Sequence, residues 1–140
     1  MSYKHILVAI DLSPESKILI SKAILIAKLN KAKISLIHVN INYSDLYTGL
    51  IDVNISNIEK KNQKEFIYNE LIRFIKESNF KFNKIINSNG DLVKSLIKSI
   101  KIHKIDLVIF GHHQDFWSKF ISYVRQFINS VPIDMLIVPL

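Results

Sequence analysis

The chain has 140 residues, no cysteine and a formal net charge of +7. This length suits one domain, residues 1–140, that buries a core without disulfide staples. Disulfide and thiolate chemistry are excluded, and a reducing compartment is compatible. The first residues lack a secretory signal pattern, and no apolar run approaches the roughly 20 residues that cross a bilayer. We therefore expect a cytoplasmic protein without membrane contact.

The positive charge is spread along the chain rather than gathered in one patch. Lysines occur in nearly every segment, and the arginines are Arg73 and Arg125. A surface that follows phosphates is expected to cluster its cations and to use arginine for bidentate contacts. We therefore interpret the lysines as solvated surface residues and expect no nucleic-acid partner. A nucleic-acid face carried by the +7 charge is the weaker alternative.

The first part of the chain alternates a strand, a helix and a strand. The β-branched run His5–Asp11 predicts the first strand. A helix should follow, with Ser13 as its cap and Pro14 at its first position, and it should end near Asn30. Ala32–Asn40 predicts the second strand. Helical spacing predicts that the buried side of the helix carries Leu19, Ala23, Ile26 and Ala27.

The middle of the chain begins with a polar connection. Asn42–Ile55 is unusually long for a connection, so we interpret it as a functional or flexible loop. Apolar residues at helical spacing then predict a helix over Ser56–Ser78, and Lys81–Asn87 predicts a weaker strand at a sheet edge. A third amphipathic helix is predicted from the spacing of Val93, Leu96, Ile97 and Ile100.

The last part of the chain contains one more helix between two strands. The apolar run Asp106–Phe110 ends at Gly111, and Ile133–Val138 is the final strand. Five strands alternating with four helices predict a single-domain α/β fold, an open and mainly parallel five-stranded sheet with helices on both faces, Rossmann-like in type. Ligands bind such sheets at the carboxyl ends of the strands, so we expect any site at the Gly111 turn.

Two features near this turn have more than one interpretation. Asp11, which ends the first strand, suits either a contact with a ribose or cation, or stabilisation of the helix start. His112, His113 and Asp115 carry atoms that bind metals. Adjacent histidines on a turn point apart, however, and no third strong ligand is near in sequence. We therefore favour a polar turn and expect no metal.

The sequence contains no recognisable catalytic pattern. Its serines lack a G-x-S-x-G context, and neither a Walker nor a G-x-G-x-x-G pattern follows the first strand. We therefore expect no catalytic residue, no enzyme activity and no cofactor. An apolar face at helical spacing, which we interpret as core packing rather than a ligand or RNA stacking face, carries Phe116, Phe120, Tyr123, Val124, Phe127 and Ile128. Trp117 falls off that face and suits an interface.

Four segments resemble the universal stress protein family: Tyr3–Ser16, Asn42–Asn54, Gly111–Lys119 and Asp134–Leu140. The resemblance runs along the whole chain, and the second and third segments are its most specific parts. It implies a five-stranded α/β sheet of the adenine nucleotide alpha hydrolase-like type and a cytoplasmic homodimer. It also implies a role in resistance to stress, including DNA damage, and phosphorylation on a Ser or Thr that the sequence does not single out.

The nucleotide-binding branch of this family carries a loop of the form G-2x-G-9x-G-[ST]. Gly111 matches its first glycine, but Gln114 and Val124 replace the second and third, and Arg125 replaces the Ser or Thr. A Cβ blocks the approach of phosphate oxygens to backbone N–H groups. The resemblance thus implies a degenerate nucleotide site, in which Asp11 is a structural remnant. A contact between Arg125 and an anion, and an ATP-binding switch with residual affinity, are the alternatives.

The resemblance also bears on the last helix and the last strand. In the family the last helix starts near Val124, and we follow that boundary rather than the periodic start at Phe116. The last strands of two subunits pair antiparallel in the family. Ile133–Leu140 suits such pairing because an apolar edge strand invites it. We therefore expect a non-enzymatic homodimer that acts through unidentified protein partners or modification.

Overall fold

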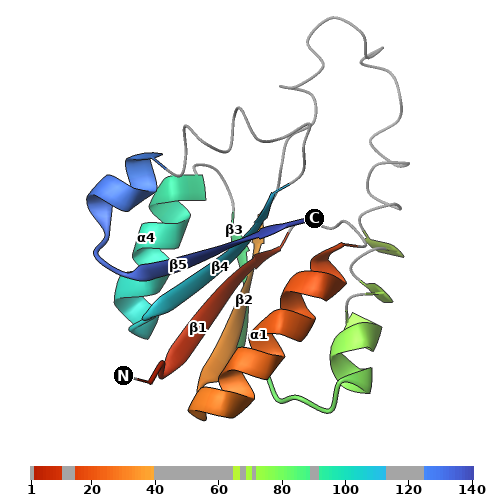
Figure 1. Ribbon diagram of the computed structural model, residues 1–140. Helices are drawn as coiled ribbons and strands as arrows, with labels where there is room; N and C mark the ends of the chain where they lie inside the picture. The colour runs from red at the N-terminus through yellow and green to blue at the C-terminus, as the bar shows by residue number, and fades with distance from the viewer. Residues whose placement is uncertain are drawn as a thin grey trace, which may run out of the picture.

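The predicted sheet is confirmed by the computed structural model, which describes residues 2–10, 15–39, 65–66, 69–70, 72–88, 92–112 and 125–140. Its strands are β1 (His5–Ile10), β2 (Lys33–Val39), β3 (Lys84–Ser88), β4 (Leu107–His112) and β5 (Asp134–Pro139). They form one sheet in the order β3-β2-β1-β4-β5, and every neighbouring pair is parallel (Figure 1).

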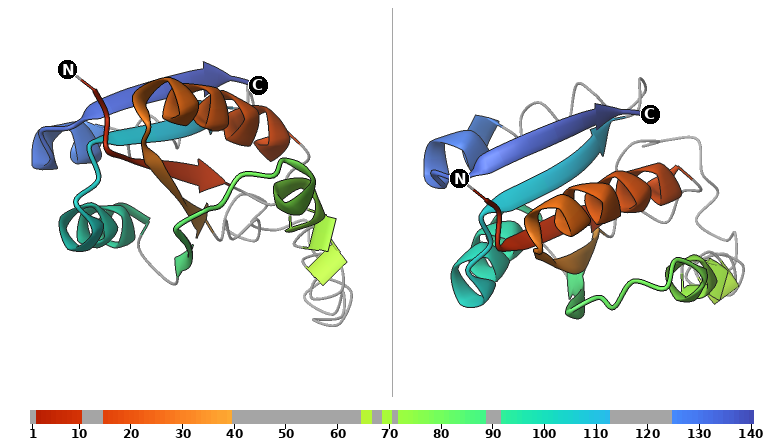
Figure 2. Two further views of the ribbon diagram at one scale, coloured as in Figure 1. Left: turned by 90° about the horizontal axis from the view of Figure 1, so that it is seen from below. Right: turned by 60° about the horizontal axis from the view of Figure 1, so that its bottom comes forward.

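Helices cover both faces of this sheet. α1 (Ser16–Asn30) lies on one face, and α4 (Leu92–His103) lies on the other with the helical residues 125–130 (Figure 2). All six residues of β1 are buried, as expected for the central strand of a covered parallel sheet. Alternate β1 side chains enter the two cores, because Val8 packs on the α1 side and Leu7 on the α4 side.

The residue that follows each of α1 and α4 is a lysine in the left-handed conformation, a position where many helices have glycine. Lys31 and Lys104 have φ angles of 57° and 53°. After Lys31, the N–H of Ala32 donates to the carbonyl oxygen of Ala27 at 2.9 Å, and Ile105 closes α4 in the same way. In this Schellman arrangement the residue after the turn packs back on the helix. Each helix is thereby joined to its next strand through a buried apolar contact.

The predicted start of α1 lies outside the described residues, and the predicted end of β4 is wrong. α1 is described from Ser16, which follows Glu15. The carbonyl oxygen of Glu15 accepts from the N–H of Ile18 at 3.0 Å. The expected cap Ser13 and the expected first helical residue Pro14 fall among residues that the structure does not describe. His112 was placed in the turn after the strand, but it extends β4 and pairs with β5.

The other predicted elements are present where the structure describes them, but β3, predicted over Lys81–Asn87, covers Lys84–Ser88. α1 ends at Asn30, and β3 lies at a sheet edge. Phe74 and Ile75, from the helix predicted before β3, pack against the α1-side core. The predicted loop Asn42–Ile55 lies outside the described residues. Within the described part of the chain, no helix has the length and apolar character needed to cross a membrane.

A buried histidine, His5, joins β1, β2 and α4 at the end of the sheet where the strands begin. His5 is 7% exposed, and its Nδ1 lies 2.9 Å from the carbonyl oxygen of His103, so Nδ1 donates. Its Nε2 lies 2.7 Å from Ser35 Oγ and accepts from that hydroxyl when the ring is neutral. Burial lowers the pKa of His5 most, and the charges of His103 and Lys33 lower it further, against the raising effects of the His103 carbonyl and Asp106.

Acidification should therefore weaken the fold through His5. Because the folded pKa lies below the value of 6.5 for a free histidine, the unfolded chain takes up the proton first as pH falls. The free energy of unfolding should decrease below about pH 6.5, by at most about 1.4 kcal/mol per pH unit from this residue. Urea denaturation at several pH values measures this decrease. In the control variant His5→Gln, the free energy of unfolding should depend less steeply on pH. An NMR titration with His5 at or above its free pKa would contradict it.

Candidate functional site

The sheet order places the predicted site at the point where ligands bind in this class of fold. β1 lies between β2 and β4, so the chain reverses its order across the sheet between β1 and β4. Such a switch point is the usual ligand crevice. The parallel register pairs Val8 with Ile109, which brings Ile10, the last residue of β1, beside Gly111, the residue before the end of β4.

Hydrocarbon fills the space beside Gly111 where a side chain would stand. A Cβ on this glycine would overlap Leu140 Cδ1 and would lie 3.0 Å from Leu19 Cδ1. Leu19 is a buried residue of α1, and Leu140 follows β5. Gly111 itself is a strand residue that pairs with Val138. Close packing on the α1 side therefore favours glycine at this position.

Arg125 does not lie on this side of the sheet. It is an exposed residue of the helical segment 125–130. The next apolar residue of that segment, Phe127, is buried, and its ring meets that of Phe110 edge-on at 5.8 Å between centroids. Both rings belong to the α4-side core. The structure thus separates Arg125 from the α1 side of Gly111, where Leu19 and Leu140 pack.

The remaining site predictions fall mostly outside the described residues, namely on Asp11, His113, Gln114, Asp115, Phe116, Trp117, Phe120, Tyr123 and Val124. The predicted core role is confirmed for Phe127 and wrong for Ile128, which is exposed because consecutive helical residues point about 100° apart.

Among the described residues, no three His, Asp or Glu side chains gather as metal ligands. Over the same residues, each buried side-chain nitrogen or oxygen has a hydrogen-bond partner.

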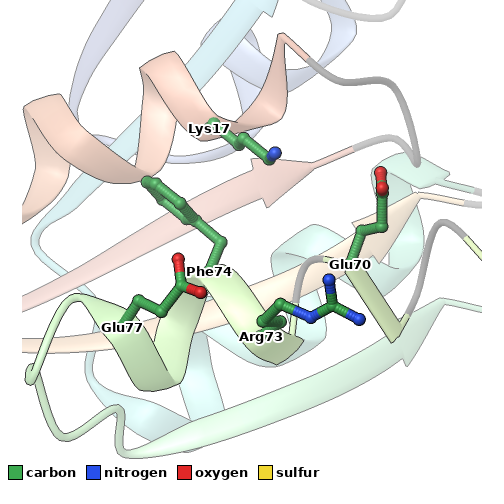
Figure 3. Close-up of a pocket in the computed structure, with 5 residues that line it drawn as sticks. All are labelled: Lys17, Glu70, Arg73, Phe74 and Glu77. Carbon is green, nitrogen blue, oxygen red and sulfur yellow. The ribbon is translucent and has the colours of Figure 1, made fainter.

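A small pocket between α1 and the helical segment before β3 was not predicted from the sequence. Its volume is about 70 Å³, and Figure 3 shows the side chains that line it, Lys17, Glu70, Arg73, Phe74 and Glu77. Lys17 Nζ lies 5.8 Å from the centroid of the Phe74 ring, within the range of a cation–π contact. Small-molecule sites usually measure about 300 Å³ or more. We therefore assign this pocket to packing between the two helices.

Comparison with known proteins identifies the family. The pattern that defines the universal stress protein family matches residues 2–139. The chain belongs to this family. Universal stress protein A of Yersinia pestis is 54% identical over 140 residues, which are 100% of this chain and 94% of that protein. Universal stress protein A of Escherichia coli K12 is 51% identical, over 100% of this chain and 96% of that protein.

Solved structures of family members share the fold. A universal stress protein in complex with cAMP superposes with a TM-score of 0.62 at 17% identity, over 99% of this chain and 98% of that one. The Archaeoglobus fulgidus universal stress protein in complex with dAMP has a TM-score of 0.59 at 13% identity, over 99% of each chain. The family and fold implied by the sequence resemblance are thus confirmed.

The packing at Gly111 predicts a specific coupling between two substitutions. Gly111→Ala should lower the free energy of unfolding by about 1 kcal/mol, at the low end of the range for overpacking, because the new methyl group displaces the end of the Leu140 side chain. Leu140→Ala should relieve part of this loss, so that the double variant is more stable than the sum of the single effects indicates. Urea denaturation of the four proteins measures the coupling. Strictly additive effects would show that Leu140 does not press on Gly111.

Proposed function

We propose that this universal stress protein is a non-enzymatic stress-response protein of the cytoplasm that does not bind ATP. It works as a homodimer, through protein partners or through phosphorylation of a Ser or Thr. The observation that carries this proposal is the packing of Leu140 and Leu19 on Gly111, the one residue that matches a glycine of the nucleotide-binding loop.

The sequence after Gly111 supports the same proposal. Gln114 and Val124 stand where the loop has its other two glycines, and Arg125 stands where it has Ser or Thr. A phosphate-binding loop works because bare backbone N–H groups reach the phosphate oxygens. Two side chains in the loop and hydrocarbon beside Gly111 both act against that approach. The proposal therefore rests on two independent features, one of sequence and one of packing.

A nucleotide-binding switch is the rival function. It is favoured by the structural neighbours that hold cAMP and dAMP on the same fold. It is also favoured by Asp11, which follows β1 directly at the switch point of the sheet. By the family resemblance, Asp11 matches the acid on the adenine and ribose side of the nucleotide site. The two functions differ in one measurable property, the affinity for an adenine nucleotide.

Isothermal titration with ATP and magnesium separates the two functions. We expect no binding with a dissociation constant of about 10 μM or tighter. The triple variant Gln114→Gly, Val124→Gly, Arg125→Ser returns the loop to the binding pattern and tests whether side chains alone block the site. Tight binding by the unaltered protein that is lost in Asp11→Ala would establish the switch and overturn the proposal.

The homodimer is proposed through the edge strand β5. Among the described strands, β5 pairs only with β4 and β3 only with β2, so each is an edge. β3 begins at Lys84, and lysine protects sheet edges from pairing. β5 carries no lysine and is apolar from Met135 to Val138. An antiparallel pair of β5 strands would bury the same apolar patch on both subunits.

A charge on β5 should therefore break the dimer, whereas the same charge on β3 should not. Leu136 in β5 is 37% exposed and Ile85 in β3 is 40% exposed, which makes them a matched pair. Leu136→Lys would place two like charges near the dimer axis, and light scattering after size-exclusion chromatography should report a monomer. Ile85→Lys should leave the dimer intact. A dimer that survives Leu136→Lys but not Ile85→Lys would move the interface to β3.

A further inference from the structure

The outward side of α1 carries an apolar row that the sheet does not use. Ile18, Leu25 and Leu29 are 47%, 61% and 79% exposed, whereas Leu19 and Ala23 point inward and are buried. The three exposed residues lie within about 20° of one line along the helix and span about 16 Å. In Figure 1 this side of α1 faces the viewer, and none of the described elements crosses it.

The spacing of this row is that of a helix–helix seam. Ile18, Lys22, Leu25 and Leu29 follow one another by four, three and four residues, which is the a/d spacing of a coiled coil. We call these four residues the α1 seam. The other exposed large apolar residues lie singly on separate elements, as is ordinary for a surface: Phe66, Ile85, Ile102, Ile128 and Leu136.

The charge around the α1 seam is positive. Lys22 lies within it, Lys28 is exposed beside it, and the exposed Lys31 follows the end of α1. Lys17 is turned to the pocket that also holds two glutamates. From residue 15 to residue 31, Glu15 is the only acidic residue. A partner that covers the seam must therefore supply negative charge at its flanks.

We propose that the α1 seam docks an amphipathic helix of a partner protein, with apolar a and d residues flanked by Asp or Glu. A groove of about 320 Å³ lies beside the seam, lined by Ser21, Ile24, Phe74, Glu77 and Ser78. Because Glu77 lines it, the groove takes an uncharged part of the partner helix, whose carboxylates face Lys22 and Lys28. This inference rests on the proposed function only in that the protein acts through partners, and the nucleotide titration tests that function separately.

Two other occupants fit the α1 seam less well. In a pair of facing α1 helices from two copies, Lys22 of each copy would enter the shared seam among further lysines, without a carboxylate to meet it. An anionic bilayer would gain little from a row that is one residue wide, because membrane-surface helices bury a broad apolar face. The a/d spacing and the positive flanks together favour an acidic helix.

The test uses a synthetic three-heptad peptide with Leu at a and d and Glu at e and g, labelled for fluorescence anisotropy. The unaltered protein should bind it, and Leu25→Ser with Leu29→Ser should weaken binding at least ~10-fold. Ile102→Ser on α4 is the matched control, since Ile102 is 60% exposed and Leu25 61%. Lys22→Glu should weaken binding of the Glu peptide and strengthen binding of a peptide with Lys at e and g.

Each alternative result overturns the proposal. No binding of the Glu peptide, or equal binding of the Glu and Lys peptides, removes the acidic helix as occupant. Binding to vesicles of phosphatidylcholine and phosphatidylglycerol that Leu25→Ser abolishes, without peptide binding, assigns the seam to a membrane. A change of oligomeric state in Leu25→Ser assigns it to a second copy. All of these results leave the ATP titration unaffected.

Discussion

The burial of β1 on both faces is the constraint on which the structure depends. Its five apolar residues, Ile6–Ile10, alternate between the α1-side and α4-side cores, so neither helix layer can be removed without exposing apolar side chains. Polar groups are therefore confined to the two ends of the strand. At the amino-terminal end, Asp106 accepts from the N–H groups of Lys4 and His5, and the His5 ring is held between Ser35 and His103. That end has a structural role, which leaves the carboxyl end for a site.

At the carboxyl end of the strands, packing can require a glycine at the same position where a phosphate-binding motif has one. Gly111 fits the first position of a phosphate-binding loop, yet the side chains of Leu19 and Leu140 occupy the space beside it. Packing of this kind favours glycine, because a Cβ could be accommodated only if the Leu140 side chain moved. One matching glycine is therefore weak support for nucleotide binding.

The sequence predicts the sheet well because burial on both faces produces continuous apolar runs, as in β1 and β4. It places His112 in a turn because the apolar run ends at Gly111, while pairing with β5 carries β4 one residue further. It misses the exposure of Ile128 because an apolar residue fits a periodic pattern whether or not a neighbour covers it. Contacts between distant residues, such as Leu140 with Gly111, have no local signal at all.

The two surfaces proposed for binding do not compete for space. β5 offers its edge in the plane of the sheet, whereas the α1 seam faces away from that plane. Antiparallel pairing of two β5 strands requires a two-fold axis perpendicular to the sheet. Such an axis keeps both α1 helices on the same face of the joined sheet. A dimer would thus present two α1 seams in one direction, and a partner with two acidic helices would gain affinity from the second contact without any new type of contact.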